Sequence, residues 1–446
     1  MLPICGVPAT IQQGLAPYRD LFCRDEGFAH ISRYITGLLL SPNKTLQGIY
    51  DLQVWDAESP SRRAMHAAVF EAQWDAEALM PRHRAIVAQA HGRRGREVIS
   101  LDWTLAHHEW GPKIYGVTKS YDYVARRMTR FQTVVTAVVA NRALVDGIEV
   151  RVQEPSRREA EEAYVQATTR ESYGHMEHVR ARLLELLHHL QHRFAYKKRT
   201  TIVVEIVEQI EQEGHFPAAH YAFDNGVLTV ELAQVIEHKG KHWVSELECS
   251  RNVMWRGQWR RIDEVAAQLR HHAPQSLRPL QVHCRSGEMK TFWAFTKTVR
   301  LRRYGRKRIV IVHEREDLTD VPRFLLSDAL HWESGRIIET WSFRWSAELF
   351  HAFGKQGTGL EAAQVRTEEA VKRHLRLSCV AQSLLQRAPV VASSVEKFEF
   401  AQGQITMGQR CRVIAREVFH ALLQVAQRLF TDGRSCEQVL EVLMPA

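Results

Sequence analysis

The sequence predicts an α/β protein: a mixed sheet with flanking helices, a β-rich insertion and an N-terminal helical domain. Residues 1–90 carry apolar side chains at helical spacing. Strand-like segments with turn signals between them follow from about residue 97. Helices and strands then alternate, which is typical of a small sheet packed between helices.

A chain of 446 residues predicts two to three domains, because a domain usually has about 100–200 residues. Changes in pattern suggest where the regions meet. We expect a helical domain (1–90), a mixed α/β domain in two parts (91–249 and 326–385) with a basic β-rich insertion between them (250–325), and a C-terminal helical region (386–446).

The N-terminal region contains two helix-like segments, Phe28–Leu40 and Arg63–Met80, with polar breaks around Pro42 and Pro60. Short helices joined in this way are typical of helix-turn-helix DNA readers. They are equally typical of structural bundles, and the sequence does not separate the two.

The central region predicts an antiparallel meander followed by alternating elements. Asp146-Gly147 is expected to be a turn inside the meander. We expect strands at Glu97–Asp102, Ile114–Val124, Gln132–Ala140, Ile148–Val152, Ala218–Phe223 and Lys241–Leu247, and helices at Arg157–Phe194, Thr200–Glu213, Val227–His238 and from Ile337 onward, with a looser stretch at Arg387–Gly403.

The stretch from Arg285 to Val310 contains nine Lys or Arg and one acid, with aromatic residues interleaved. One interpretation is a solvated β-ribbon. The other, which we favour, is a surface that follows DNA phosphates, because nine like charges repel one another without a counter-charge. Its candidate DNA-binding residues are Arg302, Arg303, Arg306 and Lys307.

The whole chain has a formal net charge of +9, which favours a polyanionic partner. Its seven cysteines are scattered, so neither a zinc knuckle nor a disulfide scaffold is expected. We find no signal peptide and no apolar run long enough to span a membrane. These features predict a cytoplasmic, nucleoid-associated protein without a membrane partner.

Two aspartates end apolar, strand-like segments. Asp102 follows EVISL, and Asp224 follows Tyr221-Ala222-Phe223. Each has an ordinary explanation: Asp102 could begin a turn or cap a helix, and Asp224 could form a turn with Asn225-Gly226 or cap the next helix.

Glu348 has more informative neighbours. On one predicted helix, Trp341, Arg344, Glu348 and Lys355 project within about 60° of arc. An Arg–Glu pair in this order adds only about 0.2–0.5 kcal/mol to a helix, so helix support is a weak reason for the arrangement.

The spacing of these four residues resembles the Tyr-Arg-Glu-Lys signature of bacterial insertion-sequence DDE transposases. The surrounding TWSFRWSAELFHAFGKQGTGLEAAQVR resembles that family's catalytic-glutamate segment. EVISLDWT is similar to its first-aspartate strand. AHYAFDNGVLTVELAQVI, followed by KHWVSELECSRN, is similar to its second-aspartate block. In order and spacing, the resemblance covers about residues 90–385.

The resemblance implies a ribonuclease-H-like catalytic domain that cleaves DNA and transfers strands. It implies Asp102, Asp224 and Glu348 as catalytic residues and ligands of Mg²⁺ or Mn²⁺, two ions being expected. It also implies that Trp341, Arg344 and Lys355 contact DNA. The expected partners are transposon ends and target DNA, bound by a homodimer.

The chain departs from the signature at Trp341, which stands where the family has Tyr. An indole can stack or donate one hydrogen bond, but it cannot act as a phenol. Two alternatives stay open: a catalytically inactive, DNA-binding relative of a transposase, and a ribonuclease-H-like nuclease with no role in transposition.

Overall fold

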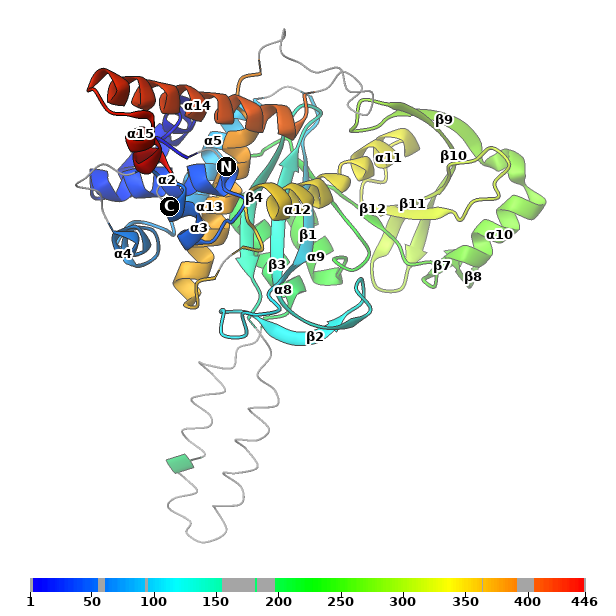
Figure 1. Cartoon of the computed structure of the whole chain (residues 1–446). Coiled ribbons are helices and arrows are strands. Elements are labelled where there is room, and N and C mark those ends of the chain that lie inside the picture. The colour runs from blue at the N-terminus through cyan, green and yellow to red at the C-terminus, as the bar shows by residue number, and fades with distance from the viewer. Residues whose placement is uncertain are drawn as a thin grey trace.

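The computed structural model describes most of the chain, and Figure 1 shows how its elements are arranged. The helix expected over Arg157–Phe194 lies outside the described residues apart from two positions, as does much of the stretch expected over Arg387–Gly403. The described residues are 3–54, 61–92, 95–154, 181–182, 197–362, 364–390 and 405–444.

Twelve strands of the described chain form one sheet, in the order β2-β3-β1-β5-β6-β12-β11-β10-β7-β8, with β4 added to β3 and β9 to β10. The first six strands are β1 (Val98–His107), β2 (Thr118–Asp122), β3 (Arg127–Ala140), β4 (Val145–Val152), β5 (His220–Phe223) and β6 (Trp243–Glu246). The last six are β7 (Asn252–Trp255), β8 (Gln258–Arg261), β9 (Arg278–His283), β10 (Met289–Leu301), β11 (Gly305–His313) and β12 (Arg323–Ser327).

The expected antiparallel meander is confirmed, because β3 pairs antiparallel with β1, β2 and β4. β5 then joins β1 in parallel, and β6 joins β5 in parallel. The turn expected at Asp146-Gly147 is wrong: both residues lie inside β4, just before a bulge of that strand at Ile148. The turn lies earlier, where the side chain of Asn141 accepts hydrogen bonds from the backbone N–H groups of Ala143 and Leu144.

Helices cover both faces of the central strands, which explains why β3 is buried along most of its length. α8 (Arg199–Glu213) and α9 (Val230–His238) pack on one face. α12 (Trp345–Gly357) and α13 (Glu368–Gln386) pack on the other. The helices expected at Thr200–Glu213 and Val227–His238 are therefore present with small shifts at their ends.

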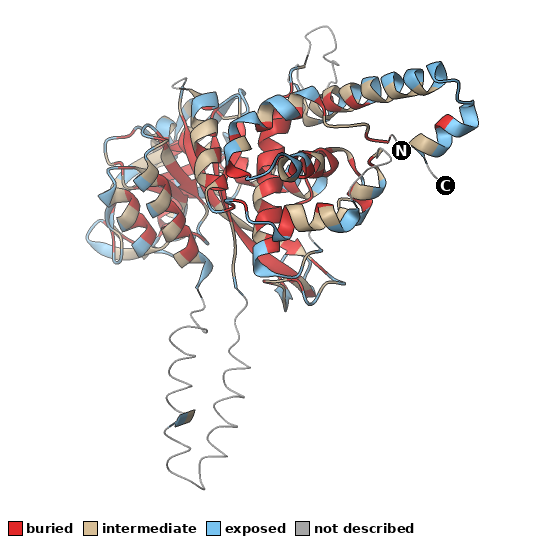
Figure 2. Cartoon of the chain, turned by 90° about the vertical axis from the view of Figure 1, so that its left-hand side faces the viewer, coloured by how far each residue is buried: buried red, intermediate tan, exposed pale blue. Residues whose placement is uncertain are grey.

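The N-terminal region is helical, as expected, but it shares its apolar core with α13 and α14 (Met407–Thr431). The expected helix Arg63–Met80 is wrong, because the backbone becomes extended at Ala72. Figure 2 shows the buried residues concentrated in the sheet and the helices against it, while the far end of α14 is exposed. The remaining N-terminal elements are α1 (Ala9–Leu15), η1 (Ala16–Leu21), α2 (Asp25–Leu40), α3 (Leu46–Asp51), α4 (Arg62–His66), η2 (Ala67–Glu71) and α5 (Leu79–His91).

The basic segment continues the main sheet, because β12 pairs antiparallel with β6. Its strands pack with α11 around a further apolar cluster. A helix inside the segment, α10, was not expected from the sequence. The other elements of this half are α10 (Ile262–His272), η3 (Pro274–Ser276), α11 (Ser334–Ser342) and α15 (Cys436–Leu443).

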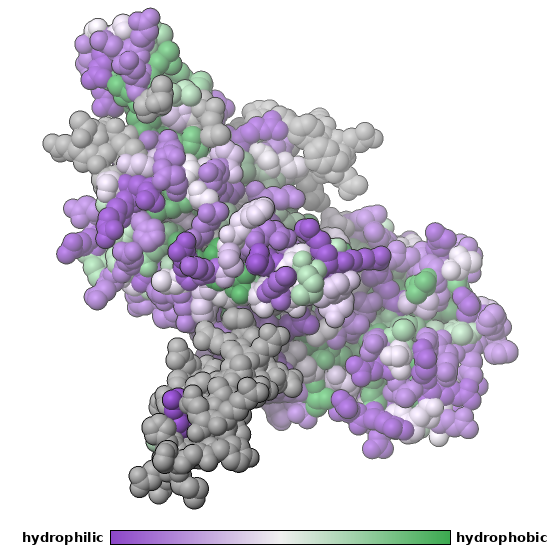
Figure 3. All heavy atoms as spheres, turned by 60° about the horizontal axis from the view of Figure 1, so that its bottom comes forward, coloured by the Kyte–Doolittle hydropathy of each residue, from purple (hydrophilic) through white to green (hydrophobic). Residues whose placement is uncertain are grey.

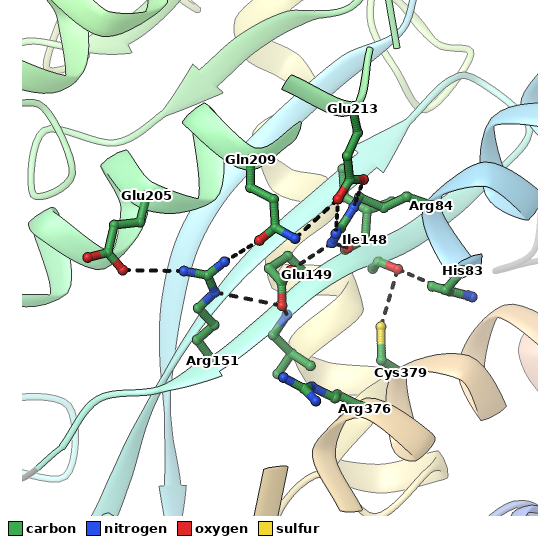
Figure 4. A network of polar contacts seen from close by, with 12 residues as sticks. His83, Arg84, Ile148, Glu149, Arg151, Glu205, Gln209, Glu213, Arg376 and Cys379 are labelled. Carbon is green, nitrogen blue, oxygen red and sulfur yellow. Dashed lines mark hydrogen bonds and ion pairs between the residues drawn. The ribbon is translucent and has the colours of Figure 1, made fainter. Parts of the chain in front are cut away.

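A buried ionic network ties α5 to the sheet (Figure 4). The guanidinium of Arg84, which is 0% exposed, donates to Glu149 on β4 at 2.6 Å and to both carboxylate oxygens of Glu213 on α8. It also donates to the carbonyl of Ile148 at 3.0 Å. The network thus joins the N-terminal helices, the sheet and α8. Within the described residues, no helix is long and apolar enough to cross a membrane.

Candidate active site

Asp102 lies in the middle of β1, opposite Thr136 on β3. The sequence predicted that the strand ends at Asp102, but it continues to His107. One carboxylate oxygen accepts a hydrogen bond from the backbone N–H of Trp103 at 2.8 Å. Burial, followed by the negative charge of Asp224, raises the pKa of Asp102 to about 7; the charge of Glu348 adds a smaller effect in the same direction. Both other predicted carboxylates are therefore close enough to Asp102 to act on its charge.

Asp224 follows β5 directly, and the parallel register pairs Leu101 with Phe223. The two aspartates therefore stand at the same level of neighbouring strands. The Oδ1 atom of Asp224 accepts hydrogen bonds from the backbone N–H groups of Gly226 at 3.0 Å and Val227 at 3.1 Å. The turn interpretation is thus correct locally and compatible with a place beside Asp102. The capping interpretation is wrong, since Thr229 caps α9.

Glu348 lies in the first turn of α12, on the face of the sheet toward which Asp102 projects. Arg344 donates a hydrogen bond to its Oε1 atom at 2.7 Å. Arg344 also lowers the pKa of Asp102, against the larger effects of burial and Asp224. One guanidinium thus acts electrostatically on two of the three carboxylates.

The single helix expected to carry the signature is interrupted. α11 ends at Ser342, α12 begins at Trp345, and Phe343 and Arg344 form a turn between them. Phe343 is fully buried, and its carbonyl accepts a hydrogen bond from the Ser100 hydroxyl on β1. The turn is therefore anchored to the sheet. The guanidinium of Arg344 nevertheless lies 5.6 Å from the centre of the Trp341 ring.

Trp341 is partly buried, with the guanidinium of Arg323 also over its ring, 5.1 Å from the centre. Within the described structure, the indole N–H of Trp341 and the Nε atom of Arg344 are buried without a hydrogen-bond partner. Unpaired buried donors are costly, so these two groups favour a site that receives an acceptor from outside the chain.

Lys355 faces β1 at the other end of α12. Its ammonium group donates to the carbonyl of Leu105 at 2.7 Å and pairs with Glu361 at 2.6 Å. It is therefore close to the strand of Asp102 but already has a counter-charge.

Two residues that support the site were not identified from the sequence. The hydroxyl of Thr136 lies 3.3 Å from the carbonyl of Asp102 and 2.8 Å from the Nε2 atom of His351 on α12. Burial lowers the pKa of His351 to about 3, so its imidazole is neutral. These contacts join β1, β3 and α12 beneath the carboxylates. Nothing in the local sequence indicates them, since they depend on how the helix packs.

The basic segment separates into two groups of cations. Arg302, Arg303 and Arg306 are exposed around the β10–β11 turn, whose Tyr304 hydroxyl lies 3.5 Å from the carbonyl of Leu228, in the loop that follows Asp224. Lys307 differs from the expectation of a DNA-facing cation. It is buried, and its ammonium group pairs with Glu237 at 3.0 Å.

The three carboxylates do not form a closed metal cage. In the described part of the chain, no group of three His, Cys, Asp or Glu side chains is arranged to hold a metal ion. Each carboxylate directs an oxygen to another donor: Asp102 to a backbone N–H, Asp224 to its own turn, and Glu348 to Arg344. The charges of Asp224 and Glu348 act on Asp102, but among the described residues the three carboxylates are not arranged around a single metal ion.

The family of DDE superfamily endonucleases matches the chain over residues 17–283. This is more than half of the 446 residues and includes Asp102 and Asp224. The chain belongs to the DDE superfamily endonucleases. Membership supports a nuclease-type enzyme. The match ends before Glu348, so it does not test a role for that residue. A comparison with curated proteins found no match.

Proposed function

We propose that this endonuclease is a DNA transposase that cleaves and rejoins the strands of an insertion sequence, with Asp102, Asp224 and Glu348 as its catalytic carboxylates. The observation that carries the proposal is the shared electrostatics of the three acids, which come from β1, the end of β5 and α12. The strand order β4-β3-β1-β5-β6, three antiparallel strands followed by two parallel ones, supports a ribonuclease-H-like domain.

The donor set fits hard divalent cations. Mg²⁺ and Mn²⁺ prefer carboxylate oxygens. Asp102 has a raised pKa because it is buried beside like charges, and a divalent cation would offset both causes. Asp102, Asp224 and Glu348 would hold the ions, of which we expect two. When bound, such ions activate the attacking oxygen and neutralise the oxygen that leaves the phosphorus.

The chain's own cations would position the DNA backbone. Arg344 already contacts Glu348, and its unpaired Nε could donate to a phosphate oxygen. The indole N–H of Trp341 could do the same in place of the family's phenol. Lys355 would exchange Glu361 for a phosphate. Arg302, Arg303 and Arg306 would extend the contact along the DNA.

The proposal extends to the regions and the assembly. We propose the helices of residues 1–90 as a DNA-binding domain, 91–249 and 326–385 as the two parts of the catalytic domain, 250–325 as the insertion and 386–446 as a helical region. We further propose a homodimer that acts on transposon ends and target DNA in the nucleoid.

Glu348→Gln tests the proposal. Glutamine keeps the size of the side chain but removes its charge, so strand cleavage in Mg²⁺ or Mn²⁺ should be lost while DNA binding stays within about twofold. The substrate is a DNA fragment carrying the sequences that flank the gene. Glu208→Gln is the matched control, because Glu208 lies on the exposed face of α8 and undergoes the same chemical change.

The products separate the candidate activities. Strand-transfer products from the native chain, absent with Glu348→Gln, would support a transposase. Cleavage without any joined product would favour a nuclease outside transposition, and binding without cleavage would favour the inactive relative. Normal cleavage by Glu348→Gln would remove Glu348 from the catalytic set.

A further inference from the structure

The β2–β3 hairpin, residues 118–131, extends beyond the strand that carries Asp102. His107 at the end of β1 pairs with Phe131, and Phe131 pairs with Thr118 at the base of the hairpin. His107 is five residues after Asp102, or about 17 Å at roughly 3.3 Å per residue. That distance corresponds to about five nucleotides of DNA at 3.4 Å each. DNA leaving the carboxylates along β1 would therefore reach this hairpin.

The hairpin and the loop before it expose large apolar side chains. Trp110 is 97% exposed, Tyr123 is 84% exposed and Val124 is 91% exposed. Tyr121 and Met128 are also exposed, and the Tyr121 and Tyr123 rings lie edge to face at 5.0 Å. In Figure 3, which brings the bottom of the molecule forward, hydrophilic side chains predominate on the described surface. A group of exposed aromatic rings in such a setting is a feature that a binding partner would explain.

The charges around these rings are mainly positive. Residues 107–131 contain five Lys or Arg and two acids. Both acids have partners within the protein: Glu109 pairs with Arg127 at 3.3 Å, and Asp122 bonds with the His107 ring at 2.8 Å. The surface therefore offers cations and aromatic rings to an anionic partner. The cations are Lys113, Lys119, Arg126, Arg127 and Arg130.

The hairpin tip is held in one conformation by Asp122. Its Oδ1 atom accepts hydrogen bonds from the backbone N–H groups of Val124 at 2.8 Å and Ala125 at 3.0 Å. Arg126 then adopts a left-handed conformation with φ of 53°, which closes the turn. Rings presented on a rigid turn lose little entropy when they bind.

We propose that this hairpin surface binds unstacked bases of the DNA beside the cleavage site, with Tyr123 and Trp110 stacking on the bases and the surrounding cations contacting phosphates. Aromatic rings combined with cations are the combination that holds single-stranded DNA. A protein partner of the same surface would need acidic groups to match these cations. The inference rests on the proposed function for the identity of the DNA, but its test does not depend on cleavage.

The test compares two variants of one ring. Tyr123→Phe keeps the ring, whereas Tyr123→Leu keeps apolar area and loses it. The probes are a fluorescein-labelled 15-base-pair duplex with a ten-thymidine overhang and the same duplex with blunt ends. Tyr123→Leu should bind the overhang probe about tenfold more weakly, Tyr123→Phe should bind it like the native chain, and neither should alter binding of the blunt probe by more than about twofold.

Phe430→Leu serves as a control, because Phe430 is an exposed aromatic residue on α14, outside the site. Unchanged binding of the overhang probe by Tyr123→Leu would overturn the inference. Equal losses on both probes would also overturn it, since stacking on unpaired bases would not then be the cause. Cleavage by the native chain and by Glu348→Gln is measured alongside. Loss of overhang binding in a chain that never cleaves would keep the hairpin assignment while removing the transposase proposal.

Discussion

Replacing Arg84 with methionine should destabilise the protein strongly. Arg84 is 0% exposed and donates to Glu149 and Glu213, whose side chains are 5% and 19% exposed. Methionine fills much of the space but removes the cation that both carboxylates share, and Glu149 keeps only the longer ion-pair contact to Arg151 at 3.9 Å (Figure 4). Breaking a buried ion pair from one side costs about 3–5 kcal/mol, and two acids share this cation, so we expect the upper half of that range.

Urea denaturation followed by circular dichroism measures the effect as a shift of the transition midpoint. Arg82→Met is the matched control, two residues away on α5. Its ion pair with Asp20 is exposed and screened by solvent, so the loss should be much smaller than for Arg84→Met. The triple variant Arg84→Met/Glu149→Leu/Glu213→Leu should recover most of the stability, because no uncompensated charge remains. Similar losses for Arg82→Met and Arg84→Met, or no recovery in the triple variant, would refute this account of the network.

Two further predictions follow from charged groups elsewhere. Burial lowers the pKa of His91, but its hydrogen bonds to Asp146 and Glu97 outweigh burial and raise that pKa overall. The protonated His91 therefore stabilises the fold fully below about pH 6.5, and this stabilisation is lost as the pH rises through the raised pKa. Thermal denaturation of His91→Gln should show a larger deficit against the native chain at pH 6 than at pH 9, and an equal deficit at both would contradict the assignment. Replacing the exposed Arg302, Arg303 and Arg306 with Gln should reduce the slope of log affinity against log salt for duplex DNA, by about 0.9 for each phosphate that the protein no longer neutralises, without a change in stability. Replacing the buried Lys307 with Gln should instead lower stability and leave that slope unchanged.

The sequence predicted most elements, because their signals are local. β-branched runs located β3, and apolar spacing located α8 and α2. Local signals were misleading where long-range contacts decide the backbone. Asp146-Gly147 looks like a turn, yet Asp146 is buried in β4 and pairs with His91 and Arg387.

The candidate site shows the same division. Spacing placed Arg344 near Glu348, and the structure has that contact. Spacing could not indicate that a turn at Phe343 and Arg344 interrupts the helix, nor that Phe343 accepts a hydrogen bond from Ser100, far away in the sequence. Composition singled out the basic segment but could not separate Lys307 from its exposed neighbours, since its partner Glu237 lies on α9, far away in the sequence. The support from Thr136 and His351 likewise depends on packing between distant elements.

The most direct test of the account is Mn²⁺ binding by the chain without DNA, measured by calorimetry. The central claim is that acids from β1, the end of β5 and α12 hold the same metal ions. Asp102→Asn, Asp224→Asn and Glu348→Gln should therefore each weaken Mn²⁺ binding by at least about tenfold, while Glu208→Gln binds like the native chain. Native-like Mn²⁺ affinity in any one of the three variants would contradict the claim that these acids form one site.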